Sequence, residues 1–328
     1  MHSKIGLSVL DLCPILSGQT ATQSFKHSVD LAAFAEGLGC RRFWMAEHHN
    51  MSGIGSSSPE VLIAHVASAT KRIRVGSGGI MLPNHAALHV AEVFRTLTAL
   101  YPGRIDLGVG RAPGSDSRAA SALRGGRGLT AENFPQQFSE LVSYLDDQEA
   151  VVAVPSHAEA PQLWLLGSSD FGALMAADRG LPYAFAQHFS HLPALEIISL
   201  YRDHFVPSRW LEKPRSMMGV HVICADTDEE ARELALSSDL SFSLFVQTGK
   251  SIPLPTVAEA RAYPYSEEDW KKVRASAMPK FVGSASTVER QLAPYLRAGV
   301  LDELMVLTMV HDQGARRRSY ELLRGFLS

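Results

Sequence analysis

A carboxylate and two imidazoles directly follow a short apolar run near the start of the chain. The run is Phe43 to Ala46, and Glu47, His48 and His49 come immediately after it. Because an imidazole titrates near neutral pH, a histidine at the rim of a buried element can hold or transfer a proton. A metal site on one strand needs His-x-His spacing instead, since alternate residues share a face. We therefore expect one histidine to face a pocket that holds no metal. The alternative is that both histidines simply lie in a polar turn.

Glycines interrupt the third apolar run of the chain. Residues 76–79 read Gly-Ser-Gly-Gly, followed by Ile-Met-Leu-Pro. Glycine removes the side chain where the backbone must contact a ligand or turn sharply. A flat ring system lying against Gly78 and Gly79 is one use of such bare backbone, and a plain turn is the other.

Two further segments suit an anion. Arg111 follows an apolar run and can grip an anion with its fork of donors. The segment Gly167-Ser168-Ser169 precedes a predicted helix, where free N–H groups and hydroxyls bind phosphate. A surface ion pair for Arg111 and ordinary helix capping by Ser169 or Asp170 are the alternatives. Asp170 would repel a phosphate here unless it points away.

The chain alternates short apolar runs with amphipathic helices. The expected strands are Ile5–Leu10, Phe43–Ala46, Ile73–Gly76, Ile105–Val109, Leu163–Leu166, Tyr183–Ala186, Met217–Cys224 and Glu303–Leu307. The expected helices are residues 24–39 with Ser24 as N-cap, 58–70, 87–100, 133–146, 170–179, 195–205 and 315–326. Eight strands alternating with helices predict an α/β fold, a (β/α)8 barrel with its active site at the C-terminal strand ends.

Two segments are longer than a barrel connection requires. They are residues 113–130, after strand four, and residues 225–302, after strand seven. Both leave from C-terminal strand ends, where segments that cover a substrate are found. We therefore expect one barrel domain over residues 1–328 with these two insertions.

Composition excludes several classes of protein. A formal net charge of −3 argues against a nucleic-acid surface. No apolar run approaches the roughly 20 residues of a membrane helix. The cysteines, Cys13, Cys40 and Cys224, have no metal or redox spacing and favour a reducing compartment. Gly108-Val109-Gly110 lacks the G-x-G-x-x-G spacing of a nicotinamide site. We expect a cytoplasmic protein that binds neither nucleic acid nor membrane.

Four strand ends, taken in order, resemble those of the bacterial luciferase-like flavin monooxygenases. They read Ala-Glu-His-His-Asn, Gly-Ser-Gly-Gly-Ile-Met-Leu-Pro, Arg-Ile-Asp-Leu-Gly-Val-Gly-Arg-Ala-Pro-Gly and Leu-Leu-Gly-Ser-Ser. Residues 7–14 and 47–51 are most similar to a subgroup that includes the mensacarcin-pathway monooxygenase, which tailors an aromatic polyketide. The resemblance covers most of residues 4–224.

The resemblance implies roles for particular residues. His48 matches the catalytic histidine beside the flavin, and Gly78-Gly79 matches a non-proline cis peptide that packs against the isoalloxazine. Arg111 and Ser168-Ser169 match the phosphate contacts. The cofactor-binding residues expected in this way are Glu47, Gly78, Gly79, Arg111, Gly167, Ser168 and Ser169. Luciferase itself has a cysteine at Gly110 and a glutamate at Gly167, so luminescence is not implied.

The resemblance also implies an activity. We expect a monooxygenase that uses reduced FMN from a separate flavin reductase, with O2, to oxygenate a small organic substrate, as in polyketide antibiotic tailoring. An F420-dependent oxidoreductase on the same barrel and a non-catalytic flavin-binding protein are the alternatives. The family's habit of forming homodimers predicts a homodimer, and helices 58–70 and 87–100 are candidates for its surface.

Overall fold

The computed structural model describes residues 5–112, 116–125, 131–156, 159–269, 271 and 279–327. Its barrel strands are β1 (Gly6–Asp11), β2 (Arg42–Met45), β3 (Arg74–Met81), β4 (Ile105–Gly110), β5 (Gln162–Gly167), β6 (Tyr183–Ala186), β7 (Ser216–Ala225) and β9 (Glu303–Leu307). They pair in parallel in the order β6-β5-β4-β3-β2-β1-β9-β7, and the pairing of β6 with β7 closes the barrel. The predicted (β/α)8 fold is confirmed.

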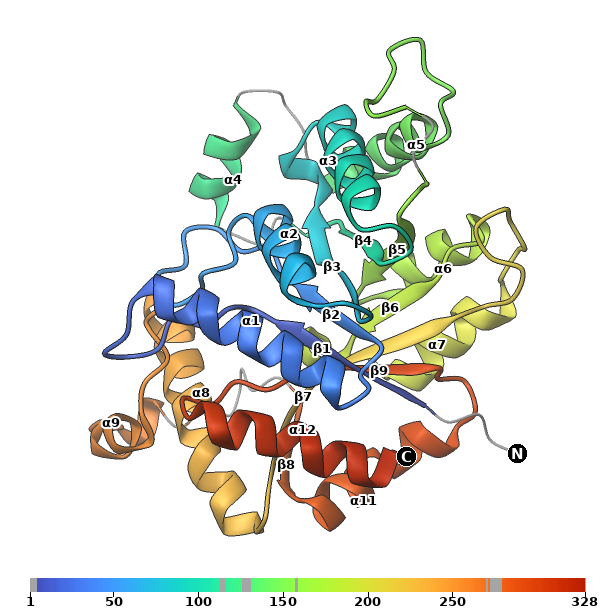
Figure 1. The fold of residues 1–328 in the computed structure, drawn as a ribbon. Coiled ribbons are helices and arrows are strands. Elements are labelled where there is room, and N and C mark those ends of the chain that lie inside the picture. Colours follow the sequence, from blue (N-terminus) through green and yellow to red (C-terminus); the bar gives the residue numbers. More distant parts are fainter. Residues whose placement is uncertain are drawn as a thin grey trace.

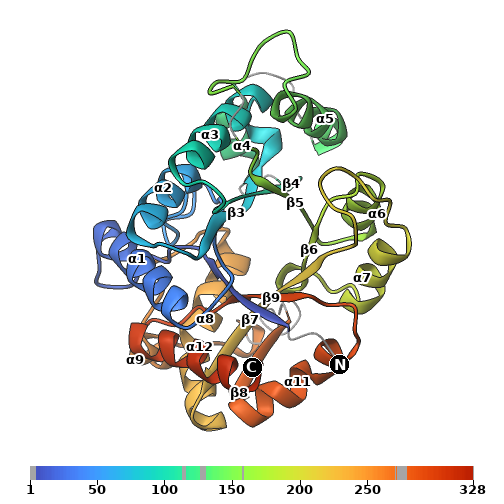
Figure 2. The same cartoon turned by 45° about the vertical axis from the view of Figure 1, so that its right-hand side comes forward.

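Helices surround the barrel (Figures 1 and 2). They are α1 (Ala21–Gly37), α2 (Pro59–Ala69), α3 (Ala87–Leu100), α4 (Ser117–Arg124), α5 (Phe134–Leu145), α6 (Asp170–Asp178), α7 (Ala194–Asp203), α8 (Asp228–Thr248), α9 (Val257–Ala262), α11 (Ala285–Arg297) and α12 (Gln313–Leu327). The 3-10 turns are η1 (Leu82–Asn84), η2 (Ala131–Asn133) and η3 (Gln187–Phe189).

Alternation along the strands divides the core into two layers. On β1, Leu7 and Val9 belong to the apolar cluster under the helices, whereas Leu10 belongs to the cluster that also contains Trp44 and Trp164. The two indole rings meet edge to face, with centroids 5.5 Å apart. Since successive strand residues point to opposite faces, the barrel interior is filled by one set of side chains and its helix-facing surface by the other.

The second insertion contains a strand that the sequence did not predict. Strand β8 (Lys280–Ser284) pairs in parallel with His221–Ala225 of β7. Its pattern of Lys-Phe-Val-Gly-Ser holds only two large apolar residues, which is too weak a signal on its own. In the first insertion, part of the segment forms α4, whereas residues 113–115 and 126–130 lie outside the described residues.

The expected start of the first helix was wrong. Helix α1 begins at Ala21, and Thr20 is its N-cap, while Ser24 lies buried within the helix. The Thr20 side chain accepts a hydrogen bond from the Gln23 amide, and the Gln23 side chain accepts one from the Thr20 amide. This reciprocal capping box satisfies two free amides and fixes the earlier start.

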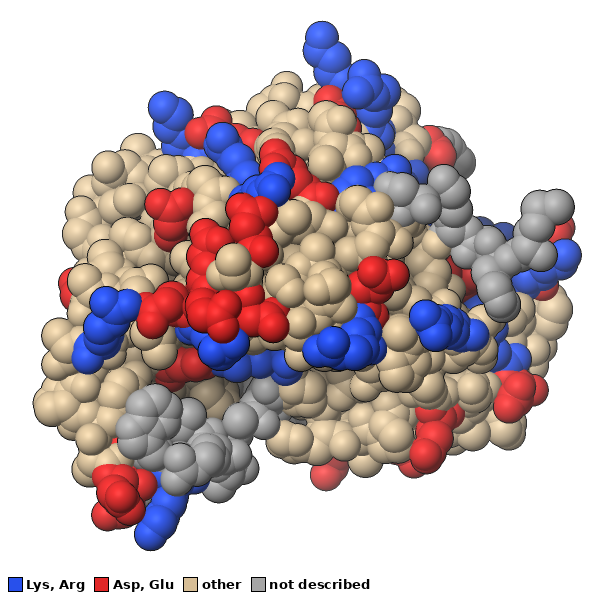
Figure 3. All heavy atoms as spheres, turned by 90° about the horizontal axis from the view of Figure 1, so that it is seen from below, with Lys and Arg blue, Asp and Glu red and all other residues tan. Residues whose placement is uncertain are grey.

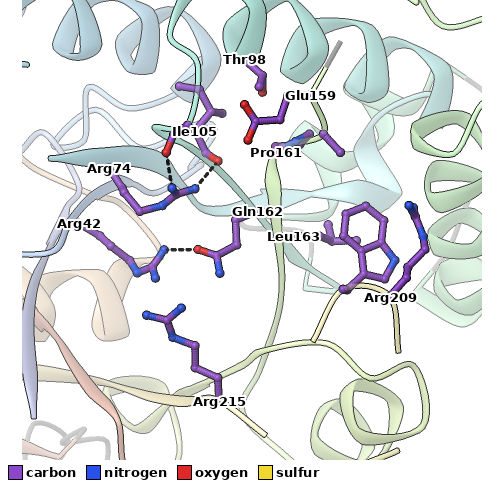
Figure 4. Close-up of a pocket in the computed structure, with 13 residues that line it drawn as sticks. Arg42, Arg74, Thr98, Ile105, Glu159, Pro161, Gln162, Leu163, Arg209 and Arg215 are labelled. Atoms are coloured by element: carbon purple, nitrogen blue, oxygen red, sulfur yellow. Dashed lines mark hydrogen bonds between the residues drawn. The ribbon is translucent and has the colours of Figure 1, made fainter. Parts of the chain in front are cut away.

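Buried ion pairs close the N-terminal end of the barrel. Arg42 Nη1 lies 2.7 Å from Asp106 Oδ2, and Arg42 Nε lies 3.0 Å from Glu303 Oε1. Arg42 also donates to Gln162 (Figure 4). Arg74 donates to Asp106 at 2.7 Å. A hollow of about 450 Å³ opens at this end. Because these two arginines are already paired with carboxylates, we interpret this end as structural.

The surface viewed from below carries basic and acidic side chains interspersed (Figure 3). This mixture agrees with the formal net charge of −3. Among the described helices, none combines the length and the apolar character that crossing a membrane requires.

Candidate active site

A cavity of about 610 Å³ lies at the C-terminal ends of the barrel strands. Of the residues predicted to form the site, six line it: Gly78, Gly79, Arg111, Gly167, Ser168 and Ser169. Glu47 and His48 adjoin this region without lining the cavity. The volume is in the range of pockets that hold a cofactor or a drug-sized ligand.

Two glycines form one wall of the cavity. The peptide bond between Gly78 and Gly79 is cis, and the pairing of β3 with β4 shifts register between Ser77 and Ile80. A Cβ on Gly78 would lie 2.8 Å from Leu10 Cδ1, and one on Gly79 would lie 2.9 Å from the Gly108 carbonyl oxygen. The Gly108 oxygen belongs to the backbone, so Gly79 has no room for a side chain, whereas the Leu10 side chain beside Gly78 can move. With glycine at both positions, the wall presents bare backbone to the cavity.

Arg111 lies at another part of the cavity, where it faces the loop after β5. Its guanidinium carbon sits 4.3 Å from the centre of the Phe171 ring, close enough for a cation–π contact. Ser169 is the N-cap of α6, but its side chain makes no capping hydrogen bond. Asp170 accepts a hydrogen bond from the Phe171 amide at 2.8 Å and so occupies one amide of this helix start.

Neighbouring hydroxyls fix the serine loop. Tyr183 Oη donates to the Ser169 carbonyl at 3.1 Å, and Ser190 Oγ donates to the Ser168 carbonyl at 2.8 Å. A Cβ on Gly167 would lie 3.1 Å from Tyr183 Oη and 3.2 Å from Gly172 Cα. Glycine at position 167 therefore allows β5 and α6 to approach closely, and a larger side chain would displace one of them.

Glu47 is fully buried and ties the ends of β2 and β3 together. His49 Nε2 and His85 Nε2 each lie 2.8 Å from Glu47 Oε1, and the Met81 amide donates to Oε2 at 2.8 Å. Burial alone would raise the pKa of Glu47, but these hydrogen bonds outweigh it and hold the pKa at about 2. The carboxylate is therefore charged and holds the strand end that follows the glycine wall.

His48 is partly buried beside this network. Its backbone amide donates to the Ser56 carbonyl at 3.1 Å, whereas its Nδ1 is buried and has no hydrogen-bond partner among the described residues. Burial lowers the pKa of His48 to about 4, and the Glu47 charge opposes this shift only in part. The imidazole is therefore neutral at pH 7 and has an unpaired nitrogen.

Two further histidines lie in this region. His188, in η3, lines the cavity, and His221, on β7, interacts electrostatically with it. Neither histidine was among the residues that the sequence predicted to form the site. The position of His188 just after the sixth strand was the available signal, whereas nothing near His221 distinguishes it.

Comparison with known proteins gives a consistent result. The sequence profile of the luciferase-like monooxygenase family matches residues 7–302. The chain is 44% identical to the uncharacterized protein YvbT of Bacillus subtilis, over 97% of this chain and 95% of that protein. It is 42% identical to a luciferase-like monooxygenase of Escherichia coli K12, over 97% and 96% of the two chains.

A solved structure is similar over nearly the whole chain. The crystal structure of apo-MsnO8 shares 38% sequence identity, covers 98% of both chains and superimposes with a TM-score of 0.90. MsnO8 is the mensacarcin-pathway protein, which agrees with the predicted subgroup. This protein therefore belongs to the luciferase-like monooxygenase family, whose members are flavin-dependent monooxygenases.

Proposed function

We propose that this protein binds reduced FMN in the cavity at the C-terminal ends of the strands and oxygenates a small organic substrate with O2. One observation carries the proposal: a single cavity of about 610 Å³ holds both a bare glycine wall and an arginine with two serines. A planar ring system fits against bare backbone, and a phosphate fits guanidinium and hydroxyl donors. The residues present therefore suit FMN.

The residues would divide the binding of FMN between them. Gly78 and Gly79 would take the ring, while Arg111 and the hydroxyls of Ser168 and Ser169 would take the phosphate. The contact with Phe171 holds the guanidinium over the start of α6. Reduced FMN, when bound, supplies the two electrons with which one oxygen atom of O2 enters the substrate and the other leaves as water. The Glu47 carboxylate would act indirectly, by holding the Met81 amide and with it the end of β3.

We assign His48 the proposed role of holding or moving a proton. Its neutral state at pH 7 lets it accept a proton, and its buried Nδ1 has no other partner among the described residues. The apolar lining of the cavity, which includes Leu10, Trp44 and Met305, would keep water away from the reaction.

Isotope labelling tests this function. Photoreduced FMN, ¹⁸O2 and a panel of small ketones, thioethers and phenols are incubated with the protein, without NAD(P)H. Mass spectrometry should detect one ¹⁸O atom in the product of at least one compound. Since no nicotinamide motif was found, we propose that a separate reductase supplies reduced FMN, and added NADH should not replace it. If His48→Ala leaves the labelled yield unchanged, the role of His48 is wrong.

F420-dependent hydride transfer and non-catalytic flavin binding are distinguished by titration. Anaerobic titration with FMN and with F420 should show tight binding of FMN only. Tight binding of oxidised FMN without label incorporation would favour a carrier protein.

The similarity to MsnO8 supports a role in polyketide antibiotic tailoring as a proposal. A homodimer and a cytoplasmic location also remain predictions, and light scattering tests the first.

A further inference from the structure

The side of the cavity opposite the glycine wall carries histidine. In the closed strand order, β7 lies across the barrel from β3, and β6 lies across from β2. His188 follows β6, lines the cavity and is only 7% exposed. Gly219 of β7 lines the cavity beside it, and a Cβ there would lie 2.8 Å from His188 Cε1. The Phe189 ring packs 4.3 Å from the imidazole, centre to centre. The imidazole is thus held in place by its neighbours.

Unpaired nitrogens mark this side of the cavity. His188 Nδ1 and His221 Nε2 are buried and have no hydrogen-bond partner among the described residues. Buried polar atoms are nearly always hydrogen-bonded, so each of these needs an explanation. The imidazoles are close enough to influence one another, since protonation of His188 lowers the pKa of both His48 and His221. Met217, Gly219 and His221 alternate along β7 and therefore share its barrel-facing side, where Met217 and Gly219 line the cavity. His188 and His221 therefore form one cluster.

The chemistry of the cluster limits what can bind. Burial lowers the pKa of His188 to about 4, although a contact with the Gly219 backbone opposes this shift, and burial lowers the pKa of His221 to about 3, so both are neutral at pH 7. A neutral imidazole offers one N–H donor and one acceptor nitrogen, which matches a hydroxyl or a keto oxygen. No three residues of the described part are placed to hold a metal ion. The rest of this wall is apolar, with Phe185, Phe189 and Met217.

We propose that His188, supported by His221, binds a hydroxyl or keto oxygen of a largely apolar substrate on the side of the cavity opposite Gly78 and Gly79. The proposal rests on the proposed function, because it leaves the glycine side to the flavin ring. It names the substrate class: an apolar, ring-sized molecule with an oxygen substituent. His188 thereby becomes a residue that determines specificity.

A matched pair of ligands tests the proposal. The full-length protein with oxidised FMN is titrated with 2-naphthol and with naphthalene, which differ only by the hydroxyl group. The wild-type protein should bind 2-naphthol about tenfold or more tightly, since naphthalene leaves the buried imidazole unpaired. His188→Phe should bring the ratio close to one. His188→Asn, which keeps a polar atom near the position of Nδ1, should restore part of the preference.

Two further readouts separate the possible failures. The affinity of each variant for FMN, measured alone, tests the proposed function and the integrity of the site. In the wild-type protein with ¹⁵N-labelled histidine, the NMR signals of His188 and His221 should move with 2-naphthol and stay in place with naphthalene. This measurement needs no variant to fold. Equal affinity of the wild-type protein for the two ligands, or unmoved histidine signals, overturns the proposal and assigns the unpaired nitrogens to bound water.

Discussion

The buried imidazole of His188 leads to a prediction about stability in acid. Burial lowers the pKa of His188 to about 4, against about 6.5 in an unfolded chain. Between these two values, the unfolded chain binds a proton that the folded protein does not bind. The free energy of unfolding therefore rises with pH from about 4 to about 6.5 and falls as acid is added within this window. His188→Phe should remove this contribution.

The size of the effect follows from the two pKa values. Lowering the pH from 7 to 5 protonates the imidazole in the unfolded chain and leaves it neutral in the folded protein. This difference lowers the free energy of unfolding by roughly 2 kcal/mol. His48 and His221, with pKa values lowered to about 4 and about 3, respond in the same direction and stay in the variant. The variant should therefore lose stability in acid as well, but about 2 kcal/mol less than the wild-type protein.

Urea unfolding followed by tryptophan fluorescence at pH 7 and pH 5 measures the difference. His191→Phe is the matched control, because His191 lies only three residues further along the chain and its side chain is exposed. The control should lose as much stability between the two pH values as the wild-type protein. If His188→Phe also loses as much as the wild-type protein, the folded imidazole accepts a proton freely and the reasoning from burial is refuted.

Three other substitutions test separate parts of the structure. Arg111→Met should weaken FMN binding about 10- to 100-fold by fluorescence titration and spare riboflavin, which lacks the phosphate; equal losses would contradict phosphate binding. Glu47→Gln should lower the free energy of unfolding by about 1–3 kcal/mol in urea at pH 7, because three hydrogen bonds lose their charge; an unchanged value contradicts this. Arg316→Met leaves buried Asp11 without its ion pair and should lower the free energy of unfolding by about 3–5 kcal/mol in the same assay. A loss below about 1 kcal/mol would show that Asp11 needs no partner.

Periodicity was sufficient to predict the barrel. Each of the eight barrel strands overlaps its predicted run, because continuous apolar segments of strand length are buried on both faces of a parallel sheet. Strand β8 was missed because only its contact with the end of β7 makes it a strand. The start of α1 was missed because Ser24 and Thr20 are both good caps, and the reciprocal bond with Gln23 decides between them.

The candidate site could be predicted only in part. Residue type and position at strand ends pointed to Arg111, the glycine pair and the serine loop, and these line one cavity. The hydrogen bonds from His49 and His85 to Glu47 depend on how two loops meet, which a linear pattern does not contain. The position of His188 could not be predicted either, because its imidazole packs against the bare backbone of Gly219 on the next strand.

The ion pairs at the N-terminal end of the barrel have a consequence for protein engineering. Arg42 joins residues from β4, β5 and β9 at the end remote from the cavity. Effects of substitutions at well-separated sites usually add. A library that randomises the cavity wall at Met81, Phe185 or Met217 should therefore retain the stabilising ion pairs of Arg42. New catalysts could then be selected without first introducing stabilising substitutions elsewhere.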